Sequence, residues 1–127
     1  MIVPRVWTDE QQQSHFADLE LAEQELPLVS GLPDVRSTAQ MPVTGFRLVT
    51  TTPRAMAQGW HPAPARQLVL VVKGSIIVEV SDGETRQLNA GSMIFFEDVD
   101  GKGHLNRVVD DEGILLAFLI VPDQWKP

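Results

Sequence analysis

The chain of 127 residues contains no cysteine and has little positive charge. Without cysteine, disulfides, a thiolate nucleophile and Cys-ligated zinc or iron–sulfur clusters are excluded. Ten Lys and Arg stand against 17 Asp and Glu, which gives a formal net charge of −7, and the basic residues are scattered singly. Because this balance opposes attraction to a phosphate backbone, we expect no nucleic acid partner.

Long apolar runs are also absent, although 43% of the residues are hydrophobic. No segment approaches the roughly 18 uninterrupted apolar residues that a membrane helix needs. The first residues, MIVPRVWTDEQQQ, show neither an export signal nor an organelle signal. We therefore expect a cytoplasmic protein with no membrane partner. A chain of this length suits a single domain with one core.

Short β segments separated by turn residues fill the chain, and helical periodicity is rare. Residues 75–96 are interpreted as a meander with an Asp82-Gly83 turn. Residues 27–44 contain three prolines and are expected to form an irregular loop that covers the domain. The pattern predicts an all-β fold, a β-barrel or a two-sheet jelly roll, with strands at 2–7, 15–21, 45–53, 67–73, 75–80, 84–88, 92–96, 105–109 and 114–122.

The stretch GWHPAPARQLVLVVKG, residues 59–74, joins a polar and proline-rich segment to an apolar strand. The strand is apolar on both faces, as expected when one face points into a barrel and the other packs on another layer. By alternation His61, Ala63 and Gln67 share the interior face. Pro62 and Pro64 fall on the opposite face and cannot donate ladder hydrogen bonds, so we interpret the segment as a rim above the barrel wall.

The spacing of His61, Ala63, Gln67 and Gly74 resembles the first motif of the cupins, whose second His is replaced here by Ala63 and whose Glu is replaced by Gln67. A second motif is similar to residues 91–104. Gly91 takes its first glycine, Glu97 its proline and Val99 its second glycine, and His104 comes two residues later than the motif's His.

The resemblance spans residues 45–121 and implies a single-domain cupin, an antiparallel double-stranded β-helix or jelly-roll barrel. Residues 1–44 then supply N-terminal strands and a covering loop. The His-Pro-Ala-Pro segment and the Glu-Asp…Gly-Lys-Gly-His loop further resemble a subgroup of small cupins without an assigned reaction. Small cupins are commonly dimers that pair through terminal strands, which implies a homodimer with Trp7 at its interface.

The same resemblance implies a candidate metal site formed by His61, His104 and the amide oxygen of Gln67. Glu97 or Asp98 lies close enough in sequence to His104 to add a carboxylate. Replacement of a His by Ala63 and of a Glu by Gln67 removes a nitrogen ligand and a negative charge. The sequence therefore leaves two alternatives, a divalent transition metal (Fe, Mn, Ni or Zn) or no cofactor.

Without a metal, His61 and His104 can exchange protons near neutral pH, with Glu97 or Asp98 as carboxylate partner. One hypothesis is therefore an enzyme acting on a small polar or carbonyl compound with or without a metal, which in the metal-free case would be an isomerase or lyase. The second is a non-catalytic module that binds or senses a small molecule, and the third is a degenerate cupin with a structural role.

Two further residues of the rim segment are candidates for ligand contacts. Trp60 offers an aromatic face and Arg66 a partner for an anionic group. Both have the opposite parity to His61. The alternative is therefore that Arg66 points to solvent and that Trp60 packs on a neighbouring strand or subunit.

Overall fold

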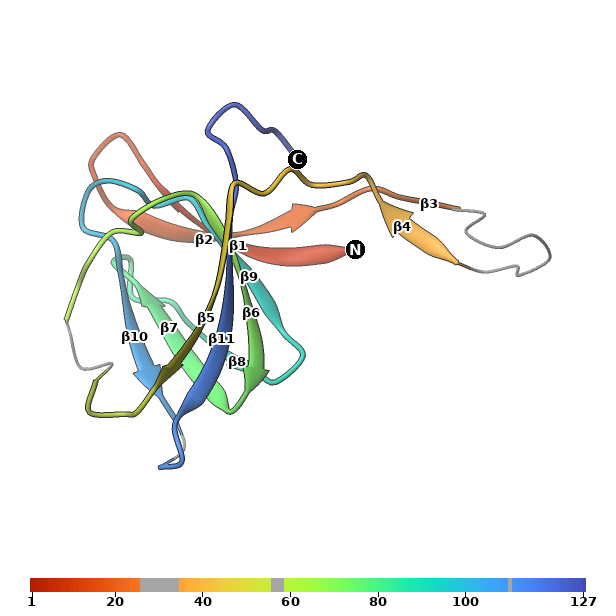
Figure 1. Ribbon diagram of the computed structural model, residues 1–127. Coiled ribbons are helices and arrows are strands. Elements are labelled where there is room, and N and C mark those ends of the chain that lie inside the picture. Colours follow the sequence, from red (N-terminus) through yellow and green to blue (C-terminus); the bar gives the residue numbers. More distant parts are fainter. Residues whose placement is uncertain (26–34, 56–58, 110) are drawn as a thin grey trace.

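The computed structural model describes residues 1–25, 35–55, 59–109 and 111–127, which form an all-β fold with no helix in these ranges (Figure 1). No helix in the described ranges is therefore long and apolar enough to cross a membrane. The strands are β1 (Ile2–Thr8), β2 (Ser14–Glu20), β3 (Glu23–Glu25), β4 (Arg36–Thr38), β5 (Gly45–Thr51), β6 (Gln67–Lys73), β7 (Ser75–Val80), β8 (Thr85–Asn89), β9 (Met93–Phe96), β10 (His104–Val108) and β11 (Ile114–Ile120).

Two sheets enclose the main core. The larger has the order β2-β1-β9-β6-β11-β5, and the smaller has the order β10-β7-β8. An inner cluster of buried side chains draws on both sheets, with Val69 and Leu116 from the larger sheet and Val78 and Leu88 from the smaller one. The core that the sequence predicts therefore lies between two facing sheets, and the paired strands of the described residues do not close into one continuous barrel.

The sheet pairing corrects two details of the prediction. Strands β1 and β9 run parallel, so the larger sheet is mixed rather than wholly antiparallel. Strands β7 and β8 form the expected hairpin, but β9 pairs with β6 and β1 in the other sheet instead of continuing a meander. The turn at Asn89-Ala90-Gly91 therefore carries the chain across from one sheet to the other, which local sequence pattern does not reveal.

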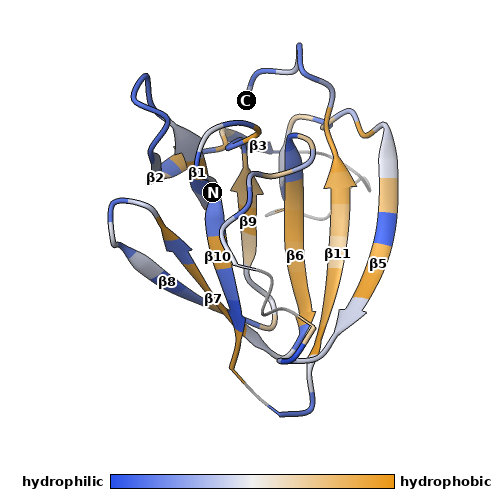
Figure 2. Ribbon diagram, turned by 90° about the vertical axis from the view of Figure 1, so that its left-hand side faces the viewer, coloured by the Kyte–Doolittle hydropathy of each residue, from blue (hydrophilic) through white to orange (hydrophobic). Residues whose placement is uncertain are grey.

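The apolar character of β6 and β11 on both faces is confirmed. Val69 and Val71 belong to the inner cluster, whereas Leu68 packs in a second cluster on the outer face of the larger sheet, with Phe95 and Val121. In Figure 2 the strands β6, β9 and β11 are mostly hydrophobic along their length, whereas β8 is mostly hydrophilic.

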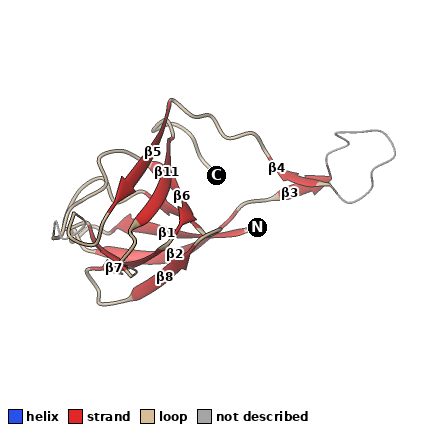
Figure 3. Ribbon diagram, turned by 60° about the horizontal axis from the view of Figure 1, so that its bottom comes forward, coloured by secondary structure: helices blue, strands red, loops and turns tan. Residues whose placement is uncertain are grey.

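The segment expected to cover the domain contains a strand instead. Arg36–Thr38 pairs with Glu23–Glu25 to form a two-stranded ribbon, and Figures 1 and 3 show this ribbon projecting away from the two sheets. Residues 27–34 of the expected loop lie outside the described residues. Because only three residues of each strand pair, neither carries enough alternation to be found from sequence.

Candidate functional site

A cavity of about 180 Å³ lies between the two sheets. Its lining combines eleven apolar residues with five polar ones, and no Lys, Arg, Asp or Glu side chain of the described ranges lines it. The apolar part comes from strands of both sheets, for example Val49 of β5 and Val78 of β7. The polar residues are Thr51, His61, Gln67, His104 and Asn106.

Two backbone hydrogen bonds bring the two cavity histidines together. The His61 N–H donates to the His104 carbonyl at 3.1 Å, and the His104 N–H donates to the His61 carbonyl at 3.0 Å. Their rings lie 4.8 Å apart between centroids. Residues 43 apart in sequence thus meet as one pair where β10 begins.

Gly103 permits this close approach. Its φ is +73°, and a Cβ built on it would lie 2.0 Å from the carbonyl oxygen of His61. The buried Ser14 hydroxyl donates to the Gly103 carbonyl at 2.6 Å and so ties this loop to β2. A side chain at position 103 would separate the two histidines, which explains why the Gly-Lys-Gly segment ends in glycine.

His104 is held by a buried carboxylate. Its Nδ1 lies 2.6 Å from Oδ2 of Asp98, whose side chain is fully buried, and the ring of Phe96 stacks on the imidazole at 4.3 Å between centroids. The Asp98 carbonyl also accepts the Ala63 N–H at 2.9 Å. With Nδ1 occupied by Asp98, Nε2 is the nitrogen that His104 has free for a ligand.

His61 is oriented by the backbone beside it. Its Nδ1 lies 3.0 Å from the carbonyl oxygen of Gly59, so Nδ1 carries the proton and donates it. In the neutral ring Nε2 is then an acceptor. Both cavity histidines therefore use Nδ1 for orientation and leave Nε2 without a hydrogen-bond partner among the described residues.

Two carboxamides complete the polar part of the cavity. Gln67 is 3% exposed and lines the cavity, and its Oε1 is buried without a hydrogen-bond partner. Asn106 also lines the cavity, and its Oδ1 is likewise buried without a partner. The sequence analysis did not identify Asn106, although it follows His104 by two positions in the same strand and therefore shares its face.

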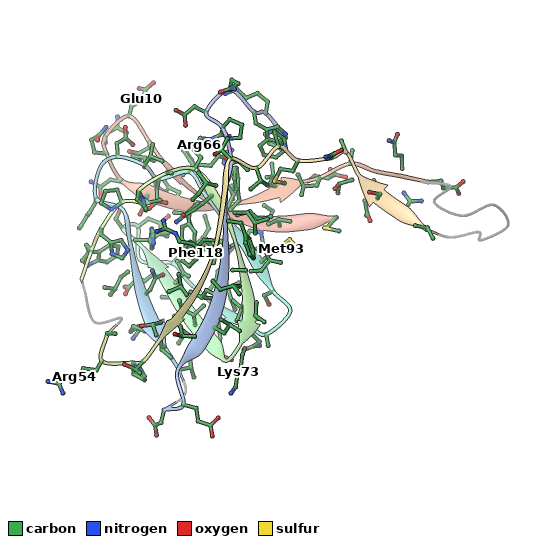
Figure 4. All side chains as sticks on the ribbon, viewed as in Figure 1. Glu10, Arg54, Arg66, Lys73, Met93 and Phe118 are labelled. Carbon is green, nitrogen blue, oxygen red and sulfur yellow. The ribbon has the colours of Figure 1, made fainter. Side chains whose placement is uncertain are left out.

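Arg66 and Glu97 do not line the cavity, contrary to their expected roles as ligand-binding and catalytic residues. The Arg66 guanidinium is buried and donates through Nε and Nη2 to Oε2 of Glu97 at 3.0 and 2.8 Å. Its Nη1 donates to the carbonyls of Pro122, Asp123 and Trp125, each at 2.9 Å. The alternative that Arg66 points to solvent is also wrong, and Figure 4 places it at the end of the sheets near the C-terminal segment.

Three other residues of the rim segment differ from a simple extended strand. Trp60 is 39% exposed and lies under the Lys102 ammonium, outside the cavity lining. Ala63 is buried in the inner core, whereas Pro64, expected on the opposite face, lines the cavity. Alternation fails here because the backbone between the bridge at His61 and the start of β6 is not a strand: residues 62–66 are irregular, with a bend at residues 64–65.

The donor set does not fit a tight transition-metal site. Two imidazoles and the carboxamides of Gln67 and Asn106 are the candidate ligands among the described residues, and no group of three or more His, Cys, Asp or Glu side chains in these ranges is placed to hold an ion. The two carboxylates that could have completed the shell bind elsewhere, Asp98 to His104 and Glu97 to Arg5 and Arg66. Divalent first-row ions usually need more nitrogen or carboxylate ligands than this.

A second titratable cluster lies away from the cavity, around His15. Nε2 of His15 lies 2.6 Å from Asp9 and Nδ1 lies 2.8 Å from Asp82, while the Trp7 ring lies 5.1 Å from the imidazole. The hydrogen bond to Asp9, followed by that to Asp82, raises the pKa of His15. The pKa of Asp9 is lowered mainly by His15, and that of Asp82 mainly by the Glu84 N–H. This imidazolium links the β1–β2 turn to the β7–β8 turn.

Comparison with known proteins gives little beyond this geometry. No protein-family model matches the chain, and no curated protein matches it. A solved structure, protein NMB1881 from Neisseria meningitidis, is 19% identical with a TM-score of 0.45, covering 78% of this chain and 100% of that chain.

Proposed function

We propose that this protein is a cupin-type jelly roll that binds a small molecule in the cavity between its sheets. The observation that carries the proposal is the convergence of His61, Gln67 and His104 on a single cavity that is otherwise apolar. An apolar pocket with a few convergent polar groups is the usual form of a small-molecule site.

The cupin assignment is supported by glycines at the two motif positions. Gly74 and Gly91 have φ values of +85° and +91°, a conformation that favours glycine. Each stands at a turn, Gly74 between β6 and β7 and Gly91 before β9.

The experiment compares two phenylalanine substitutions on one strand. Val49 lines the cavity, whereas the adjacent Leu48 is 61% exposed, so Val49→Phe fills the cavity and Leu48→Phe adds a ring outside it. A panel of small hydroxy and carbonyl compounds is screened by thermal shift and by ¹H–¹⁵N NMR. Compounds that bind wild type and Leu48→Phe are expected to lose affinity at least tenfold in Val49→Phe. Equal binding by both variants would place the ligand elsewhere.

A second candidate function, proton transfer on a carbonyl compound, is favoured by the Asp98–His104 pair. The buried carboxylate fixes the proton on Nδ1 and aims Nε2 as the base, the arrangement by which an orienting carboxylate supports general base catalysis. His104 would take a proton from the carbon next to the carbonyl, and the NH₂ group of the Gln67 or Asn106 carboxamide would donate a hydrogen bond to the oxygen. This chemistry uses no metal.

Deuterium exchange tests this candidate directly. Dihydroxyacetone in D₂O is followed by NMR for loss of its carbon-bound protons with wild type, His104→Gln and Asp98→Asn. We expect both variants to slow exchange, His104→Gln to the uncatalysed rate. Exchange by wild type no faster than by His104→Gln would remove this candidate for dihydroxyacetone and leave ligand binding as the function.

A further inference from the structure

The charge of the cavity wall restricts what can bind inside it. Among the residues that the structure describes, no Lys, Arg, Asp or Glu side chain lines the cavity, and the ionisable groups of the lining are the two histidines. Moving an unpaired ion from water into such a site carries a large desolvation cost. A ligand with a fixed charge would therefore need a counter-charge from His61 or His104.

Asp98 opposes the use of His104 for that purpose. Its carboxylate is fully buried on the Nδ1 side of the ring, and Oδ1 has no hydrogen-bond partner. A positive charge on His104 is already paired with this carboxylate. An anionic ligand would place a second negative charge on the other side of the same ring, while an ammonium ligand would find no carboxylate on the wall.

The polar groups that remain suit a hydroxyl group. The free Nε2 of neutral His61 accepts a hydrogen bond, and the carboxamides of Gln67 and Asn106 each carry both a donor and an acceptor end. The oxygen of each carboxamide is buried and has no hydrogen-bond partner among the described residues. Turning the carboxamide group over would bring that oxygen to the side that faces the ligand, where it can accept a hydrogen bond. One hydroxyl group can donate to His61 Nε2 or to a carboxamide oxygen and at the same time accept from a carboxamide NH₂ group.

The volume sets the size of the ligand. An apolar cavity of roughly 150 Å³ accommodates benzene, and this cavity measures about 180 Å³. Eleven apolar residues surround it. A single ring, or a branched aliphatic group of similar size, with one small polar substituent therefore fits.

Building on the proposed small-molecule function, we infer that the ligand is an uncharged molecule of single-ring size carrying one hydroxyl group. The polar group lies between His61 and the carboxamides of Gln67 and Asn106, and the ring lies against the apolar wall between the sheets.

Four compounds of nearly equal shape test this inference, namely benzyl alcohol, benzoate, benzylammonium and toluene. Their dissociation constants are measured at pH 7 by ¹H–¹⁵N NMR titration of wild type, Gln67→Leu and Gln87→Leu. Gln87 is an exposed glutamine of β8 and provides the matched control. We expect benzyl alcohol to bind at least tenfold more tightly than either ion and at least threefold more tightly than toluene. Gln67→Leu should remove the preference over toluene, and Gln87→Leu should preserve it.

The possible results test the small-molecule function and the neutral ligand separately. Failure of all four compounds to shift the cavity resonances would overturn both the small-molecule function and the inference drawn from it. Binding of benzoate or benzylammonium as tight as that of benzyl alcohol would leave the function standing and refute the neutral ligand. Equal affinity for toluene and benzyl alcohol would refute the polar substituent.

Discussion

The buried Arg66 should contribute strongly to stability and little to ligand binding. It donates two hydrogen bonds to Glu97 and three to carbonyl oxygens of the C-terminal segment, and its side chain is 10% exposed. The substitution Arg66→Met keeps the length of the aliphatic stem and removes the guanidinium. It leaves three carbonyls and one side of Glu97 without their donor.

The expected cost can be worked out from these partners. Removing one member of a buried ion pair costs about 3–5 kcal/mol because the other charge stays buried. Glu97 retains Arg5 at 2.6 Å and is itself 14% exposed, so we expect the lower end, about 3 kcal/mol. For a chain of this size such a loss lowers the melting temperature by roughly 10 °C.

The assay is thermal and urea unfolding of wild type, Arg66→Met, Glu97→Gln and the double variant, followed by circular dichroism. The double-mutant cycle should give a coupling of more than about 1 kcal/mol between the two side chains. The affinity for benzyl alcohol should stay within twofold of wild type at 25 °C. A melting temperature within about 3 °C of wild type, or a coupling near zero, would show that the hydrogen bonds of the guanidinium to Glu97 and the C-terminal segment contribute little to stability.

Three further predictions concern other parts of the molecule. The pKa of His15 is raised in the folded protein, so its hydrogen bonds to the two aspartates stabilise the fold below about pH 6.5. This stabilisation is lost as the pH rises through the raised pKa. The pKa values of both aspartates are lowered, so the stabilisation is also lost in acid, when the carboxylates become protonated. The melting-temperature difference between wild type and His15→Gln should therefore peak near pH 5–6 and shrink on both sides, and a flat profile would contradict the link. Gly103→Ala should lower the free energy of unfolding in urea by at least about 2 kcal/mol more than Gly91→Ala. Both glycines have positive φ, but a Cβ at Gly91 meets nothing within 4 Å. Equal losses in the two variants would contradict the close contact between Gly103 and the His61 carbonyl. The homodimer implied by the cupin resemblance pairs through the N-terminal strands with Trp7 at its interface, so Trp7→Glu should sediment as a monomer with an unchanged spectrum, and a monomeric wild type would refute the expectation.

Local pattern was sufficient to find most of the strands. Alternation and turn residues located nine segments that correspond to the strands of the two main sheets, and the doubly apolar run at 67–73 was identified as a strand buried on both faces. These features depend on neighbours within a few residues, which is the range that periodicity and turn chemistry describe. The three-residue strands β3 and β4 escaped because they are too short to alternate.

The cavity polar groups were partly predictable for the same reason. His61, Gln67 and His104 were found from their spacing along the chain, and all three line the cavity. Asn106 could have been found from its alternation with His104. The assignment of Pro64 failed because the rim segment bends at a bridge, and alternation holds only where the backbone stays extended.

The sequence by itself determined an all-β chain without thiol chemistry, with apolar strands and with histidines near two turns. Only the tertiary structure decided which acidic residue pairs with arginine and which with histidine. Glu97 and Asp98 are adjacent in sequence, yet one binds the arginines on the outer side and the other lies buried against His104. Successive side chains of an extended chain point to opposite sides, and what each side meets depends on strands that pair across long sequence separations. Arg66 joins the C-terminal segment instead of the cavity for the same reason.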